Sequence, residues 1–190
     1  MCLNGCDRRE RVYRRPEERY AQCCISERVA YGGGSVMFWG GISYDARTEL
    51  VFVPSGGRGG GLTAARYITE ILEDHVVPYA GMFDEGFMLM QDNAPCHTAR
   101  VTAAYLREVG IHTMVWPAMS PDLNPIEHMW DRLKRNVRAR NPAPATVDEL
   151  KIALLEEWEA IPQNYIRKLI KSMKNRLRCV SRARGSNTRY

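Results

Sequence analysis

A run of four apolar residues that leads directly to an acid constrains the fold of this chain most. The run, Phe87 to Met90, is apolar at every position and ends two residues before Asp92. Apolar side chains on both faces are expected of a central strand in a sheet that helices cover. Helix-period patterns lie on either side of it, at 64–79 and 98–109. These patterns predict an α/β domain with a mixed sheet flanked by helices.

Further strands follow from short apolar or alternating runs bounded by glycine and proline. They are predicted at 11–14, at 35–43 with a hairpin partner at 49–53, and at 112–116. A helix is predicted over 125–140, after a loop that is rich in proline.

A proline-rich segment at 141–145 is the best linker candidate in the chain. We therefore expect residues 1–140 to form one domain and residues 146–190 to form a basic helical extension. In the extension, Thr146 and Glu149 are spaced as a capping box for a helix that runs to about residue 159. A last helix near 163–178 stacks five apolar side chains on one face: Ile166, Leu169, Ile170, Met173 and Leu177.

The composition is ordinary for a globular protein that stays inside the cell. Of the 190 residues, 45% are hydrophobic and 26% are charged, and no apolar run approaches the ~18 residues of a membrane helix. The first residues lack the apolar core of a signal peptide. Six cysteines without such a signal indicate reduced thiols rather than a disulfide framework.

Charge is distributed unevenly along the chain. Residues 1–131 contain 12 Lys and Arg against 17 Asp and Glu, whereas residues 132–190 contain 15 against 5. A basic segment on an acidic body indicates a polyanionic partner, most often nucleic acid. The alternative is a basic helix face that is merely solvated. The side chains predicted to contact DNA phosphates are Arg132, Arg135, Arg138, Arg167, Lys168, Lys171, Lys174 and Arg178.

Two carboxylates lie at positions where α/β folds often carry catalytic residues. Asp92 follows the predicted central strand, and active sites of open sheets gather at the carboxyl ends of strands. Glu127 is the third residue of a helix with Asn124 as its N-cap and Pro125 as its first residue. Each has a structural alternative, because Asp92 could cap the next turn and Glu127 could complete a capping box. Together they could bind one divalent cation such as Mg²⁺, which is usually held by one or two carboxylates and substrate phosphates.

Long motifs around these acids resemble the Tc/mariner transposase superfamily. They are QDNAPCH at 91–97 and SPDLNPIE at 120–127, with 34 residues between Asp92 and Glu127. That spacing is similar to the Tc branch, whose acidic triad is Asp, Asp, and then Glu after 34 residues. Three further segments look like the same family: RRPEERY at 14–20, GGGSVMFWGGIS at 32–43 and GSNTRY at 185–190.

The resemblance implies a ribonuclease-H-like core that cleaves and joins DNA with two Mg²⁺ or Mn²⁺ ions. Asp92 matches the second acid and Glu127 matches the third. The first acid belongs to a central strand that would precede residue 3, and Asp7 matches a hairpin-turn residue instead. We therefore expect a transposase domain that is truncated at its amino end and inactive alone. The alternative is a nucleic-acid-binding protein that keeps the fold without the chemistry.

The same resemblance implies transposon ends and target DNA as partners, a homodimer in a full-length context, and a nuclear location. Asn93 and His97 share a loop with Asp92 and are candidates for contact with the substrate, although His97 could equally be a helix-start residue without a function. A zinc site at Cys2, Cys6, Cys23 and Cys24 is disfavoured, because the spacing lacks paired C-x₂-C motifs. Cys96 is disfavoured as a nucleophile activated by His97, because the two residues are adjacent in the sequence and adjacent side chains point in different directions.

Overall fold

The computed structural model describes residues 36–54, 61–83, 86–118 and 120–183. The predicted strand at 11–14 and the four cysteines of the disfavoured zinc site lie outside these ranges. In the described part of the chain, two strands come first, helices and strands then alternate, and helices follow to the end, as the sequence predicts.

The predicted hairpin is confirmed, with shorter strands than expected. Strand β1 (Met37–Trp39) pairs antiparallel with β2 (Val51–Val53), so that Phe38 lies opposite Phe52. Beyond the strands, the Thr48 hydroxyl accepts a hydrogen bond from the Gly41 amide at 2.8 Å, and the Thr48 amide donates to the Gly41 carbonyl at 2.9 Å. A bridge between Ile42 and Arg47 and a hydrogen bond from the Ser43 amide to the Ala46 carbonyl continue the pairing to residue 43.

The expectation that 87–90 is buried on both faces is wrong. Strand β3 (Met88–Leu89) pairs in parallel with β4 (His112–Thr113), but the Met88 side chain is 53% exposed. The described strands form two separate two-stranded sheets, one antiparallel and one parallel. Because no described strand joins β3 to the hairpin, one side of β3 faces an open cleft instead of another strand.

The predicted helix at 64–79 is a continuous helical segment with a π-helical centre. It consists of α1 (Ala64–Tyr67), η4 (Ile68–Val76) and α2 (Val77–Ala80). The predicted helix at 98–109 is confirmed as α4 (Arg100–Glu108), and a short helix that was not predicted, α3 (Pro95–Thr98), precedes it across the extended residue Ala99. Gly110 follows α4 with φ of +73°, a backbone conformation that glycine adopts without strain.

Helix α5 (Ile126–Arg138) and helix α6 (Val147–Ala160) flank the predicted linker. The predicted capping box is confirmed, because Thr146 accepts from the Glu149 amide and the Glu149 carboxylate accepts from the Thr146 amide. Residues before and after the linker belong to one hydrophobic cluster, in which Leu133 of α5 and Trp158 of α6 are both buried.

The last predicted helix is two helices, α7 (Gln163–Lys171) and α8 (Met173–Arg182). Ser172 lies between them, and its hydroxyl donates to the Leu169 carbonyl at 2.6 Å. The prediction of an apolar inward face is confirmed for Ile166 and Leu169, which are buried. It is wrong for Leu177, whose side chain is 55% exposed. The break at Ser172 turns a different face of α8 inward, and Arg176 occupies the buried position.

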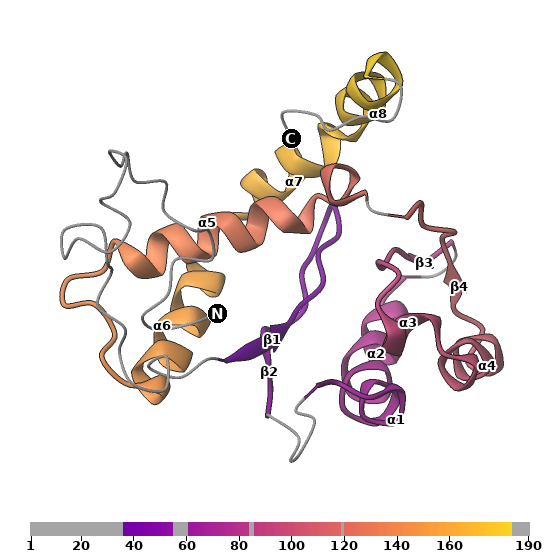
Figure 1. The fold of residues 1–190 in the computed structure, drawn as a ribbon, viewed down its shortest axis with the longest axis horizontal. Helices are drawn as coiled ribbons and strands as arrows, with labels where there is room; N and C mark the ends of the chain where they lie inside the picture. Colours follow the sequence, from indigo (N-terminus) through magenta and orange to yellow (C-terminus); the bar gives the residue numbers. More distant parts are fainter. Residues whose placement is uncertain (1–35, 55–60, 84–85, 119, 184–190) are drawn as a thin grey trace, which may run out of the picture.

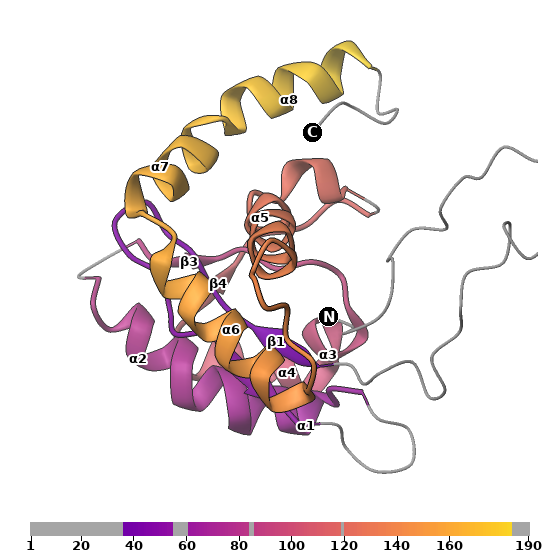
Figure 2. The same cartoon turned by 90° about the vertical axis from the view of Figure 1, so that its left-hand side faces the viewer.

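The hairpin separates two hydrophobic clusters. One contains α5, α6 and α7, and the other contains η4, α4 and the residues around β3. Figure 1 shows β1 and β2 between these two sets of elements. In Figure 2, α7 and α8 form a curved path that passes α5. No helix among the described residues is long and apolar enough to cross a membrane.

Candidate active site

Asp92 lies three residues after β3 and is held by its own loop. One carboxylate oxygen, Oδ1, accepts from the Ala94 amide at 3.1 Å and from His97 Nδ1 at 2.8 Å. Asp92 thus caps the following turn, which was the structural alternative raised by the sequence, and its side chain remains 58% exposed.

Further contacts from Tyr67 stabilise this loop. The Tyr67 ring packs against the His97 ring with centroids 4.6 Å apart, and the Tyr67 hydroxyl donates to Gln91 Oε1 at 2.7 Å. Burial raises the pKa of Tyr67, so its hydroxyl stays protonated and remains a donor. Sequence reasoning missed Tyr67 and Gln91, because they are 24 residues apart and only the fold brings them together.

Glu127 lies in the first turn of α5. The helix begins at Ile126, one residue later than predicted, and Asn124 Oδ1 accepts from the Ile126 amide at 3.3 Å. The prediction of Asn124 as the N-cap is therefore wrong by one residue: Pro125 occupies the N-cap, and the Asn124 side chain accepts from the first amide of the helix. The chain enters the helix through turn η5 (Pro121–Leu123), in which Leu123 is buried.

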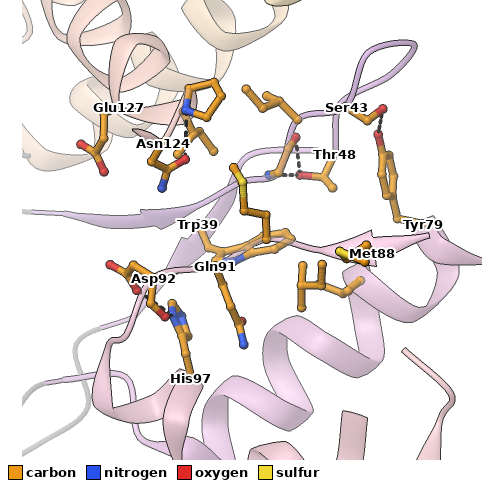
Figure 3. Close-up of a pocket in the computed structure, with 18 of the residues that line it drawn as sticks. Trp39, Ser43, Thr48, Tyr79, Met88, Gln91, Asp92, His97, Asn124 and Glu127 are labelled. Carbon is orange, nitrogen blue, oxygen red and sulfur yellow. Dashed lines mark hydrogen bonds and ion pairs between the residues drawn. The ribbon is translucent and has the colours of Figure 1, made fainter. Parts of the chain in front are cut away.

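Asp92 and Glu127 line the same cleft from opposite sides. The cleft has a volume of about 830 Å³. Figure 3 shows both carboxylates at one end of the cleft, with Trp39 and Met88 further in. Partial burial raises the pKa of Glu127, the charge of Asp92 raises it further, and Lys134 opposes the shift. A strand end and a helix start thus bring both acids to one cleft.

The two acids present carboxylate oxygens to the cleft. Among the described residues, no group of three or more His, Cys, Asp and Glu side chains could hold a metal ion. Carboxylate oxygens are the ligands that Mg²⁺ and Mn²⁺ prefer, and Mg²⁺ is often held by only one or two of them. Asp92 and Glu127 therefore fit one ion that completes its coordination with water and substrate phosphate.

Two other loop residues have structural partners. Asn93 donates from Nδ2 to the Trp116 carbonyl at 3.0 Å, which links the loop after β3 to the loop after β4. Burial raises the pKa of the Cys96 thiol, and a protonated thiol is a poor nucleophile. The structure therefore gives no support to thiol chemistry at Cys96.

The predicted DNA-contacting residues differ in how freely they face solvent. On α5, the Arg132 guanidinium lies 4.3 Å from the centre of the Tyr165 ring. Arg135 forms an exposed ion pair with Asp131 at 3.1 Å, and Arg138 is also exposed. These contacts leave Arg135 and Arg138 accessible, whereas Arg132 packs against α7.

On α7, Arg167 donates to the Tyr44 carbonyl and pairs with Asp45 at 3.3 Å, so it binds the loop between β1 and β2. Lys171 lies 5.4 Å from the Tyr44 ring centre. The remaining basic side chains of this set are exposed: Lys168, Lys174 and Arg178, together with Lys171.

Comparison with known proteins defines the class first. Residues 9–151 match the family model described as DDE superfamily endonuclease, which covers most of the chain and both cleft acids. The chain belongs to this superfamily, on its Tc/mariner transposase branch. It is 35% identical over 192 residues to the Tc1 transposase of Caenorhabditis elegans. The aligned region covers 99% of this chain and 66% of that protein.

A second relative is the Tc3 transposase of Caenorhabditis elegans, which is 35% identical over 167 residues. That match covers 87% of this chain and 49% of the relative. The chain thus spans between about half and two thirds of the length of these transposases.

Solved structures agree on the fold. The Mos1 transposase catalytic domain, in a structure with Raltegravir and Mg, superposes with a TM-score of 0.68 at 18% identity, over 80% of this chain and 77% of that one. A Mos1 mariner paired-end complex with Mn gives 0.70 at 19% identity, over 94% of this chain and 52% of that one. The predicted ribonuclease-H-like fold class is therefore confirmed.

Proposed function

We propose that this chain is the catalytic domain of a Tc-type transposase, which cleaves and joins DNA strands with Mg²⁺ or Mn²⁺. The observation that supports the proposal is the convergence of Asp92 and Glu127 on one cleft. A divalent ion bound there would supply Lewis acidity to the phosphate that undergoes displacement. Relatives of known structure include Mos1 complexes with Mg and with Mn, which favours these two metals.

The protein groups around the ion have separate tasks in this proposal. Asp92 offers one carboxylate oxygen to the metal while His97 and the Ala94 amide hold the other. Glu127, whose pKa is raised in the free protein, gives up any bound proton when it binds the cation. Asn93 fixes the loop through Trp116, and His97 lies beside Asp92, where it would contact a substrate phosphate.

The proposed substrate is DNA at transposon ends and at the target site. A neighbour of known structure is a Mos1 paired-end complex with the left transposon end. In this chain the exposed basic side chains of α5, α7 and α8 would contact DNA phosphates, whereas the partly engaged Arg132 and Arg167 would contribute less. A homodimer in a full-length context and a nuclear location are further parts of the proposal, since both follow from the transposase family.

One observation favours a second candidate function. In the described part of the chain only two acids meet in the cleft, whereas a two-metal clamp needs a carboxylate that bridges both ions. A domain with two acids would bind one ion weakly and would catalyse poorly by itself. The second candidate is therefore a nucleic-acid-binding protein that derives from a transposase and has no catalytic activity.

Titration calorimetry with Mn²⁺ separates the two candidates. We expect one weak site in the unmodified chain, and loss of that site in Asp92→Asn and in Glu127→Gln. Asp131→Asn is the matched control, because Asp131 is an exposed acid on the same helix as Glu127. Absence of Mn²⁺ binding would favour the second candidate, and two tight sites would show that another residue completes the triad.

A further inference from the structure

Arg176 is a fully buried arginine in a helix that sequence reasoning assigned to DNA binding. Its exposed fraction is 0%, although arginine is almost never fully buried unless its charge is paired or hydrogen-bonded. Its Nε donates to Ser172 Oγ at 2.9 Å, one turn earlier in the chain. Its Nη1 donates to the backbone carbonyl of Asp122 at 2.9 Å, 54 residues earlier in the sequence.

The Asp122 carbonyl belongs to the turn that leads into Glu127. Asp122 is the middle residue of η5, and η5 packs against α8. The Asn124 amide donates to the Pro121 carbonyl at 2.9 Å, and the Glu127 amide donates to the Asn124 carbonyl at 3.3 Å. These backbone hydrogen bonds link Pro121, the neighbour of Asp122 in η5, through Asn124 to the residue that carries the carboxylate.

We propose that Arg176 is a positioning residue: from α8 it fixes turn η5 and thereby holds the Glu127 carboxylate in the cleft. The proposal rests on the proposed function, in which Glu127 binds the metal ion. It gives the helices after Ile161 a part in the active site in addition to any contact with DNA.

The chemistry of the guanidinium explains why this position carries arginine. Its donors form a rigid planar fork, so one side chain can hold two acceptors at fixed angles. Ser172 Oγ orients the fork through Nε, and the Ser172 hydroxyl is itself directed at the Leu169 carbonyl. An apolar residue would fill the space without the desolvation cost of a charge, but it would leave the turn free to move.

The test compares Arg176→Met and Arg176→Lys with Arg107→Met. Arg107 is an exposed arginine of α4 and its replacement removes the same charge, so it is the matched control. Mn²⁺ affinity by calorimetry should fall about tenfold or more in Arg176→Met, the range expected when a group that orients a ligand is removed. Arg176→Lys should recover part of the affinity, and Arg107→Met should bind Mn²⁺ as the unmodified chain does.

A metal-free measurement keeps the two proposals distinguishable. Amide hydrogen exchange at Asn124 and Glu127 should accelerate in Arg176→Met, while amides of α6 keep their protection. If the unmodified chain binds no Mn²⁺, the proposed function fails and the exchange data still decide the role of Arg176. Equal Mn²⁺ affinity and equal exchange in a folded Arg176→Met would overturn the positioning role.

A milder variant covers the case in which Arg176→Met does not fold. Ser172→Ala keeps the arginine and removes only the hydroxyl that orients Nε. It should weaken Mn²⁺ binding less than Arg176→Met and accelerate exchange at the same two amides. Unchanged values for Ser172→Ala, with a Mn²⁺ site intact in Arg176→Lys, would contradict the proposal.

Discussion

Trp158 should be the residue whose shortening damages the domain most clearly. It is fully buried in α6, and its indole Nε1 donates to the Thr48 carbonyl at 3.0 Å. Its ring stacks on Trp130 of α5 with centroids 5.5 Å apart. Trp158→Phe keeps an aromatic ring and removes the donor and one fused ring, so it tests how tightly the segment after the linker is joined to the hairpin.

The expected cost has two parts. Removing the donor from a buried carbonyl costs about 1–3 kcal/mol. The smaller ring also leaves a cavity, although the total stays below the 3–5 kcal/mol typical of Trp→Ala. We expect Trp158→Phe to lower the free energy of unfolding by about 2–4 kcal/mol, a large share of the ~5–15 kcal/mol of a native domain.

Gly40 supplies a second variant that tests the same packing. A Cβ at Gly40 would lie 3.2 Å from Cζ2 and Cη2 of Trp158, two atoms that phenylalanine lacks. Gly40→Ala should therefore cost about 1–3 kcal/mol as an overpacking change. The cost should fall in the Trp158→Phe background, which gives a coupling of about 1 kcal/mol between the two sites.

Urea denaturation followed by far-ultraviolet circular dichroism measures these values. Ile152→Ala is the control, because Ile152 lies on the same helix and is 56% exposed. It should change the free energy of unfolding by much less than Trp158→Phe does. A Trp158→Phe cost below about 0.5 kcal/mol, or strictly additive costs in the double variant, would refute this packing.

Two further predictions concern charge. Glu127→Gln should stabilise the chain above pH 4.5 and have no such effect below it, because a raised native pKa means that the ionised carboxylate destabilises the fold. Melting temperatures measured between pH 3 and 8, with Asp131→Asn as control, test this, and a gain in melting temperature that is independent of pH would contradict it. Replacing Lys168, Lys171, Lys174 and Arg178 with glutamine should flatten the slope of log affinity against log salt for duplex DNA by about 0.9 for each phosphate that these side chains neutralise. An unchanged slope would place the DNA interface elsewhere.

Local patterns in the sequence predicted the hairpin, the Thr146 capping box and the meeting of Asp92 with Glu127. Each depends on residues that are close in the chain, or on the general rule that strand ends and helix starts gather at one edge of a sheet. Met88 was misjudged, because an apolar run reports what a strand can bury and not whether another strand covers it.

The end of the chain was harder to predict for a related reason. Helical periodicity favoured Leu177 as an inward residue, but the break at Ser172 changed which face of α8 packs. Arg176 counted only as a positive charge in the sequence. Its partner, the Asp122 carbonyl, is a backbone group 54 residues away that leaves no trace in the residue pattern.

Binding of a divalent ion by Asp92 and Glu127 together can be observed by paramagnetic line broadening in nuclear magnetic resonance spectra, with Mn²⁺ added well below one equivalent. We expect selective broadening of the amides of Asn93, Ala94, Glu127 and His128, which disappears in both Asp92→Asn and Glu127→Gln. Broadening centred on the exposed acids of α6, or spread evenly over the chain, would contradict it.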